Sequence, residues 1–567
     1  MTTSNHCHKD YSGLLSLPMT ATERTAIDAL VLHGSQNTAA AALGWPRTKL
    51  QSRLRSVQAR AQAAAAVVPE EPVVHGHVPA PSAQHPQHPA GATTARYILS
   101  SAQNNTPVHP QFMANLEAYA EAIGARIMIA RYSYNKSAYG AKSVKAGRAP
   151  NADDHGELWY DPAIAPYICD DPERHGSCRW QLAPDLMWCA EDNNLPTAPK
   201  PLSGMKSYSG PASGIFPHAK IQIDPVPVFG DAPPKFNYST GSCTQRNYIQ
   251  KRTGIKAEFH HAYGALLVEV DLVTGHWWAR HLNATDDGTF YDLTHKVDGG
   301  EVTSGHRLLA INFGDIHASE IDPIVRAVNW GRSDSAIDTL RPQFQFWHDT
   351  LSFRNRSHHE TKSVAARYAK FCGGMETDSV EYELKVTADL MRIAHRDWCQ
   401  MIVVSSNHDR HGEKWLDECK PEQDLVNAEF YHEASKVRLA AIRLGEPYDF
   451  LHWAMQREDV AHLARFLRRD EDCIIGPPGH EIQCGQHGDE GANGSRGSLV
   501  SFAQMPVRMN VGHSHSAGVL NGVYQAGVCT RRLGYAHGAS SWSISHIGTY
   551  NNGKRMLLTQ SGGKLWL

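Results

Sequence analysis

The sequence predicts an α/β protein in which an α/β sandwich follows an accessory α/β domain and an N-terminal helix-turn-helix. From residue 306 to the C-terminus, short apolar stretches alternate with amphipathic helical stretches, and this alternation is typical of a layered α/β domain. A helical, alanine-rich pattern occupies residues 19–65. With 567 residues, of which 41% are hydrophobic and 20% charged, the chain is long enough for several globular domains.

Residues 1–65 are predicted to form a small helical unit. Thr22 can cap a first helix that Gly34 ends, a second helix starts near Asn37, and Pro46 leads into a longer basic helix. This order resembles a helix-turn-helix whose last helix carries cations able to contact DNA phosphates. The alternative is a helical bundle used for assembly or docking. The cations are Arg47, Lys49, Arg53 and Arg55.

A Pro/His-rich linker, 66–95, and an accessory α/β domain, 96–305, are predicted next. The linker has no periodicity, and its prolines favour an extended chain. In the accessory domain we expect a strand, a helix and a strand over 96–134, and a hairpin that turns at Thr274 and Gly275. The role of this domain stays open. In the last domain, 306–567, we expect helices at 364–371, 425–445 and 459–470 and strands at 401–406 and 507–515.

Composition predicts a soluble cytoplasmic protein with no membrane partner. No run of about 18 apolar residues occurs, and the first residues lack the layout of a signal peptide. The eleven cysteines are scattered and form no CxxC pair, which favours a reduced compartment. A net charge of -3 from 55 basic and 58 acidic residues argues against a globally basic nucleic-acid coat, although local basic patches stay open.

Histidine, aspartate and asparagine recur in five short motifs of the last domain. Each motif follows an apolar or β-rich stretch, so each is expected where a strand ends and a loop begins, the place where α/β sheets present ligands. Carboxylates, imidazoles and an amide are the groups that hold paired divalent ions. The pattern therefore predicts a two-metal hydrolase of phosphate esters. In chain order the residues are Asp315, His317, Asp349, Asn407, His408, Asp409, His487, His513 and His515.

This order resembles the calcineurin-like metallophosphoesterases, in which Asp-x-His, Asp, Asn-His-Asp/Glu, His and Gly-His-x-His follow one another. The resemblance implies a four-layer α/β sandwich over 306–567 and two divalent ions, Mn²⁺ first and Mg²⁺ or another divalent ion as the alternative. It implies that His408 lies over the phosphate and assists the leaving oxygen, oriented by Asp409. One ion would take Asp315, His317, Asp349 and His515, and the other Asp349, Asn407, His487 and His513.

Some positions depart from the family pattern. His348 stands before Asp349 where glycine is usual, Ser352 follows where Asn or Asp is usual, and Ser406 replaces another glycine. His480 also competes with His487 for the role of the lone histidine. In the loop behind His487, Asn493 and Arg496 are candidate substrate contacts, and Arg531 and Arg532 are candidate phosphate contacts; the alternative for these cations is solvated loop charge.

Longer sequence segments indicate the substrate. The stretches 97–109, 487–498, 512–527 and 540–546 resemble the phage-encoded metallophosphoesterases of the phage T5 pre-early A1 type, which are implicated in degrading host DNA. The resemblance implies a metal-dependent DNase that acts by attack of a metal-activated hydroxide in the host cytoplasm, with DNA as its partner. Two alternatives stay open: a nucleotide or cyclic-nucleotide phosphoesterase of small substrates, and a non-catalytic DNA-binding regulator. Homo-oligomer formation is also left open.

Overall fold

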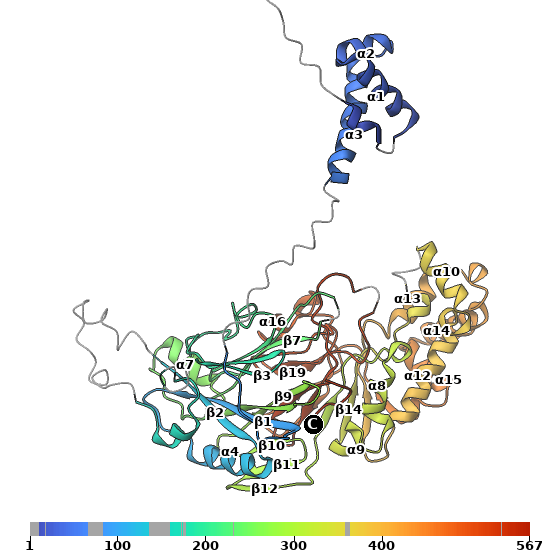
Figure 1. The fold of residues 1–567 in the computed structure, drawn as a ribbon. Helices are drawn as coiled ribbons and strands as arrows, with labels where there is room; N and C mark the ends of the chain where they lie inside the picture. The colour runs from blue at the N-terminus through green and yellow to red at the C-terminus, as the bar shows by residue number, and fades with distance from the viewer. Residues whose placement is uncertain are drawn as a thin grey trace, which may run out of the picture. The chain divides into compact units, whose positions relative to one another are not determined.

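The computed structural model describes residues 11–16, 19–65, 83–134, 159–171, 173, 177–230, 232–357, 363–533 and 536–567. The chain divides into two compact units, Met1–Pro79 and Ala80–Leu567 (Figure 1). Most of the predicted linker, 66–82, lies outside the described residues, as does 135–158. No helix in the described part of the chain combines the length and apolar character that crossing a bilayer requires.

The smaller unit contains the three predicted helices. The first helix starts two residues earlier than expected, because Thr20 and not Thr22 is its cap. Thr20 Oγ1 accepts from the Glu23 backbone N–H, and the Glu23 carboxylate accepts from the Thr20 backbone N–H. Gly34 ends this helix in the left-handed conformation, as predicted. Ile27, Leu30, Leu50 and Leu54 fill the core of the unit. The helices are α1 (Ala21–His33), α2 (Gln36–Ala42) and α3 (Arg47–Ala65).

A four-stranded sheet with strand order β2-β1-β8-β9 begins the larger unit. β1 (Thr94–Gln103) and β2 (Arg126–Tyr132) are parallel and joined by α4 (Pro110–Ile123), which confirms the predicted strand, helix and strand. β8 (Gly264–Asp271) and β9 (Trp277–Asn283) form the predicted hairpin, with Gly275 at φ 78. α4 covers one face of this sheet. The small sheet β10 (Phe290–Asp292), β11 (His295–Asp298) and β12 (Glu301–Thr303) packs beside α4.

A six-stranded mixed sheet, in the order β16-β15-β14-β13-β22-β23, carries most of the predicted motifs. Four of its strands pair in parallel: β13 (Ala310–Asn312), β14 (Phe344–Trp347), β15 (Gln400–Val403) and β16 (Ala464–Phe466). β22 (Ser545–Thr549) pairs antiparallel with β13, and β23 (Arg555–Thr559) pairs antiparallel with β22. Helices cover one face in a common apolar cluster (Figure 1). They include α9 (Ala336–Leu340), α12 (Val380–Ala394), α13 (His411–Glu418), α14 (Ala428–Leu444) and α15 (Phe450–Arg457).

The prediction of a helix over 459–470 was wrong. This segment contains a short 3-10 turn, Ala461–Leu463, and then strand β16. Its backbone pairs in parallel with β15 at the edge of the six-stranded sheet, so tertiary pairing overrides the local helical preference. The helices expected at 364–371 and 425–445 are present as α10 (Val364–Cys372) and α14.

A ten-stranded sheet lies across the predicted boundary between the accessory and last domains. Five strands come from 179–239 and five from 474–525, and β6 pairs with β20 to join the two groups. The division at 305/306 therefore falls within one compact unit. In sheet order the strands are β17 (Ile474–Ile475), β18 (Ile482–Gln483), β19 (Arg508–Val511), β21 (Val523–Gln525), β20 (Gly518–Leu520), β6 (Ile223–Val226), β7 (Lys235–Ser239), β5 (Ser213–Phe216), β4 (Leu186–Cys189) and β3 (Arg179–Ala183).

The sheets pack in layers, which gives the mixed α/β fold that the sequence predicts. Trp188 and Tyr238 of the ten-stranded sheet share an apolar cluster with Leu266 of β8 and Leu557 of β23. The β9 edge also lies beside β23, where the Asn283 side chain donates to the Arg555 carbonyl at 2.7 Å. The ten-stranded sheet thus packs on the four-stranded and six-stranded sheets, whose outer faces the helices cover.

Candidate metal centre

The predicted ligands lie on loops at one edge of the six-stranded sheet. Because β13, β14 and β15 are parallel, their carboxyl ends meet, and the loops after them carry Asp315, Asp349 and Asn407. β19 carries His513 and His515 to the same place. The amide of Asn510 in β19 donates to Asn312 Oδ1 in β13 at 2.9 Å, which fixes the two strands together just before their ligands.

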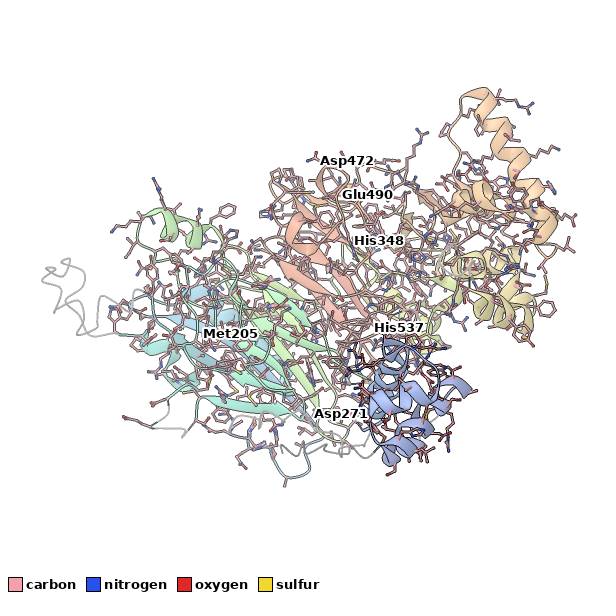
Figure 2. All side chains as sticks on the ribbon, turned by 90° about the horizontal axis from the view of Figure 1, so that it is seen from above. Met205, Asp271, His348, Asp472, Glu490 and His537 are labelled. Atoms are coloured by element: carbon pink, nitrogen blue, oxygen red, sulfur yellow. The ribbon has the colours of Figure 1, made fainter. Side chains whose placement is uncertain are left out.

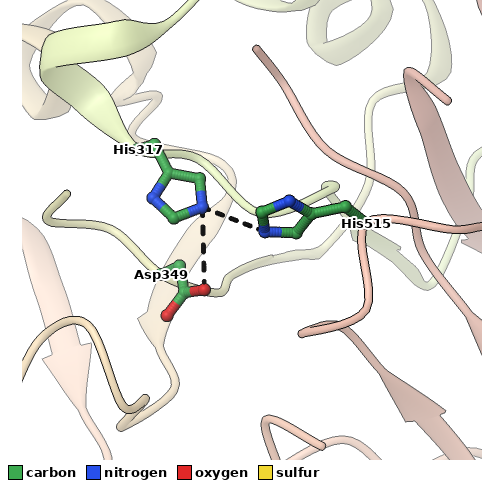
Figure 3. A group of neighbouring side chains, drawn as sticks. All are labelled: His317, Asp349 and His515. Atoms are coloured by element: carbon green, nitrogen blue, oxygen red, sulfur yellow. Dashed lines mark hydrogen bonds and ion pairs between the residues drawn. The ribbon is translucent and has the colours of Figure 1, made fainter. Parts of the chain in front are cut away.

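The first group of ligand atoms belongs to His317, Asp349 and His515 (Figure 3). The two imidazole Nε2 atoms lie 3.1 Å apart, and His317 Nε2 lies 3.7 Å from Asp349 Oδ2. Asp315 adds a second carboxylate, since its Oδ2 lies 3.3 Å from His515 Nε2. All four predicted residues of one site are therefore together.

The second group consists of Asp349, His487 and His513, whose candidate ligand atoms lie within 4.8 Å of one another. His487 Nε2 is 3.4 Å from Asp349 Oδ1 and 3.1 Å from Asn407 Oδ1. Asp349 belongs to both groups: Oδ2 faces the first and Oδ1 the second. It occupies the place of the shared carboxylate that the sequence predicts.

These residues fit a pair of divalent cations. Within the described part of the chain, both oxygens of Asp315 and Oδ2 of Asp349 are buried and have no hydrogen-bond partner. A buried carboxylate without a partner is costly, and a bound cation would satisfy it. Carboxylate, imidazole and amide donors suit Mn²⁺ and comparable divalent ions.

Electrostatics divides the histidines into two kinds. Burial lowers the pKa of His515 to about 3 and that of His317 well below its usual range, so both imidazoles are neutral and able to bind a metal. Burial opposes charge on His487 too, but the Asp349 carboxylate outweighs it and raises the pKa of His487 to about 9. Burial would raise the pKa of Asp349, yet the neighbouring imidazoles of His487 and His408 hold it well below normal.

Backbone strain is concentrated at the same loops. His317, Asp349, His513 and His515 have φ values of 46, 44, 73 and 59°, four of the twelve non-glycine residues with positive φ among those the structure describes. Such conformations cost free energy and cluster at functional sites. Gly512 contributes differently, because a Cβ there would collide with Asp315 Oδ1. The absence of a side chain lets β19 approach the Asp315 carboxylate.

His408 lies beside the first group. Its ring centroid is 4.7 Å from that of His317, and its backbone N–H donates to Asp349 Oδ1 at 3.3 Å. Its Nδ1 is 2.9 Å from the Ser352 carbonyl, which orients the ring. The sequence assigns this orienting role to Asp409, and the structure corrects it.

Asp409 instead joins the loops of the second and third motifs. Its Oδ1 accepts from the Leu351 backbone N–H at 2.8 Å, and its Oδ2 accepts from the Ser406 hydroxyl at 2.8 Å. Ser406, which departs from the family pattern, is thus a partner for this buried carboxylate. Burial, reinforced by the charge of Asp349, raises the pKa of Asp409 to about 7.

The loop after His487 lies close to the second group. Arg496 is exposed and near enough to His513 to add to the lowering of its pKa, which burial dominates. Asn493 is exposed in the turn Ala492–Gly494, and no contact joins it to the ligands among the described residues. His480, the competitor of His487, is exposed and lies against Gly553 outside both groups.

The two candidate phosphate cations after β21 have protein partners. Arg531 bonds to the Asp322 carboxylate, although its side chain is exposed. Arg532 donates to the carbonyls of Ala536 and Gly538. Their interactions are therefore local and structural in this conformation.

Three residues near the site were not predicted to have a role. Arg469 donates to the Ser405 carbonyl at 3.2 Å and to Asp489 Oδ1 at 2.9 Å, so it connects the loops that carry Asn407 and His487. His348 is fully buried in the middle of the larger unit (Figure 2), with its ring centroid 5.6 Å from that of His487. Trp542 packs edge-on against His515, with centroids 4.2 Å apart.

Comparison with characterised proteins reveals one long similarity. The chain is 36% identical over 487 residues to Protein A1 of Escherichia phage T5, and the aligned region covers 83% of each protein. No family model and no solved structure matches the chain.

Proposed function

The chain belongs to the family of Protein A1 of Escherichia phage T5, and we propose that it is a two-metal phosphodiesterase of the calcineurin-like metallophosphoesterase kind that degrades DNA. The observation that carries the proposal is the buried Asp349 carboxylate shared by two groups of histidine and acidic ligands. The layered sheets on either side of it are compatible with the four-layer sandwich expected of such an enzyme.

Two divalent cations bound there would supply a nucleophile at neutral pH and stabilise the charge of an in-line displacement. Asp315, His317, Asp349 and His515 would hold one, and Asp349, Asn407, His487 and His513 the other. His408 would act on the leaving oxygen. The Ser352 carbonyl engages its Nδ1, which leaves Nε2 to exchange a proton with that oxygen.

The smaller unit supports DNA as the substrate. Arg47, Lys49, Arg53 and Arg55 are exposed on α3, which follows α2 after a short turn, as the recognition helix does in helix-turn-helix proteins. Such a helix would hold the chain on DNA through phosphate contacts and raise the local concentration of cleavable bonds. The similarity to Protein A1 adds only that the family occurs in a phage.

Cleavage assays test the proposal. Linear duplex DNA, circular duplex DNA and bis-p-nitrophenyl phosphate are incubated with the protein in Mn²⁺, Mg²⁺ or EDTA, and we expect DNA cleavage with a divalent ion and none with EDTA. Asp315→Ala and His408→Ala should reduce the rate by at least about 10²-fold. Cleavage of the small ester alone would instead favour the nucleotide phosphoesterase, and DNA binding without cleavage would favour a regulator.

A further inference from the structure

An open groove lies beside the candidate metal centre. It has a volume of about 820 Å³ and is lined by α10, by the start and end of α13, and by the turn that follows α13. This volume is within the range of about 300–1,000 Å³ typical of ligand sites. The metal ligands themselves do not line it.

His411 links the groove to the centre. It is the first residue of α13 and lines the groove, and its ring centroid is 4.5 Å from that of His408. His408 in turn lies 4.7 Å from His317, centroid to centroid. A single side chain, that of His411, therefore lies between His408 and the groove.

The walls of the groove are aromatic and apolar but exposed. Tyr368 and Phe371 lie three residues apart on one face of α10 and are 68% and 71% exposed, and Leu425 on the opposite wall is 80% exposed. Exposed apolar groups gathered in a concavity mark a binding site. Exposed flat rings suit nucleobases, which stack on aromatic side chains regardless of sequence.

The charges of the groove suit a phosphate backbone. Arg356 pairs with both Asp378 and Asp424, at 2.8 and 2.7 Å, and the lining as a whole carries four cations and three carboxylates. Arg367 and Lys420 are exposed on the two walls, and neither has an ion-pair partner among the described residues. The groove therefore offers aromatic faces together with unpaired cations, the combination found in single-strand binding channels.

We propose that this groove binds an unpaired DNA strand next to the bond that is cleaved. The bases stack on Tyr368 and Phe371, and the phosphates face Arg367 and Lys420. The inference rests on the proposed function for its substrate class and adds that the strand is unstacked from its partner before it reaches His408. Overhangs and frayed ends are then better substrates than blunt duplex ends.

Binding measured without metal tests the groove separately from catalysis. The full-length protein is titrated in EDTA with a fluorescent thymidine oligomer of about twelve nucleotides and with a duplex of the same length. Tyr368→Ala/Phe371→Ala should weaken binding of the single strand by at least about tenfold and change duplex binding much less. Arg367→Gln/Lys420→Gln should reduce the salt slope for the single strand by about 1.4.

Two controls accompany the test. Phe259→Ala removes an equally exposed aromatic side chain from a distant helix, α7 (Arg252–Phe259), and should leave single-strand binding unchanged. Tyr368→Phe/Phe371→Tyr keeps the stacking faces and should retain binding.

Unchanged single-strand affinity in the double alanine variant would overturn the proposal that the groove binds an unpaired strand. Equal weakening of duplex binding and single-strand binding would overturn it as well. Light scattering that shows loss of an assembled species with intact strand binding assigns the surface to a second copy instead. A protein that binds the strand through the groove but never cleaves DNA in Mn²⁺ refutes only the proposed nuclease.

Discussion

Metal binding to the second group of ligands should release a proton and strengthen with pH. In the metal-free protein the Asp349 carboxylate raises the pKa of the buried His487 to about 9, so His487 is protonated at neutral pH. A protonated imidazole cannot bind a metal, and the cation must displace that proton. Raising the pH toward 9 removes the competition, and above 9 no further gain is expected.

The pKa sets the size of the effect. At pH 7 about 1% of His487 is deprotonated, which costs the binding reaction about 2.7 kcal/mol, or about 100-fold in affinity. Between pH 6.5 and 8.5 the affinity of the second site should therefore rise about tenfold per pH unit. His317 and His515 are already neutral in this range, because burial holds the pKa of each far below it, so neither adds to the pH dependence of the first site.

Calorimetric titration with Mn²⁺ in buffers of different ionisation enthalpy measures both affinity and the protons released. His487→Gln should abolish the pH slope of the second site, whereas His480→Gln, which alters an exposed histidine outside the centre, should keep it. The reasoning fails if the affinity of the wild-type second site is flat across this range, or if no proton is released at pH 7.

Three further predictions concern metal content and DNA binding. Asp349→Asn should remove both bound metals and reduce activity by at least about 10³-fold, and the exposed Asp459→Asn serves as the control. Two metals per chain in Asp349→Asn, counted by mass spectrometry, would contradict a shared carboxylate. Arg469→Gln should weaken metal binding at the second site by about 10- to 100-fold. Arg465→Gln breaks only a surface ion pair with Glu471 and should leave the metal affinity unchanged. Equal metal affinity in both variants would show that Arg469 does not support the site. Replacing Arg47, Lys49, Arg53 and Arg55 by glutamine should lower the salt slope of duplex binding by up to about 3.6, and an unchanged slope would leave the smaller unit an assembly module.

The site could be predicted from sequence because its ligands follow strands directly. Asp315 and Asp349 come within three residues of the ends of β13 and β14, so parallel pairing alone brings them together. Arg469 could not be found in this way, because its partners lie 64 and 20 residues away and nothing in the local sequence links them. The orientation of the His408 ring could not be predicted from the sequence either, since it depends on the backbone carbonyl of Ser352 and not on a side chain.

Fold prediction succeeded where local signals agree with tertiary structure. Gly34 ends α1 as predicted, whereas the capping box of Thr20 and Glu23, and not Thr22, starts it. The segment that contains β16 has a helical pattern, and only its pairing with β15 makes it a strand. The pairing of β6 with β20 has no local signal at all, so the sequence does not show that one sheet takes strands from both sides of 305/306.

The joining of β6 to β20 also constrains how the chain is made. Val519 follows its partner Ile223 by 296 residues, so at about 5–20 residues per second synthesis of the intervening chain takes roughly 15–60 s. During that time the first five strands of the sheet expose the β6 edge, and a bare edge is able to pair with other nascent chains. Pro225, inside β6, lacks a backbone N–H and so weakens such mispairing while the native partner is still being translated.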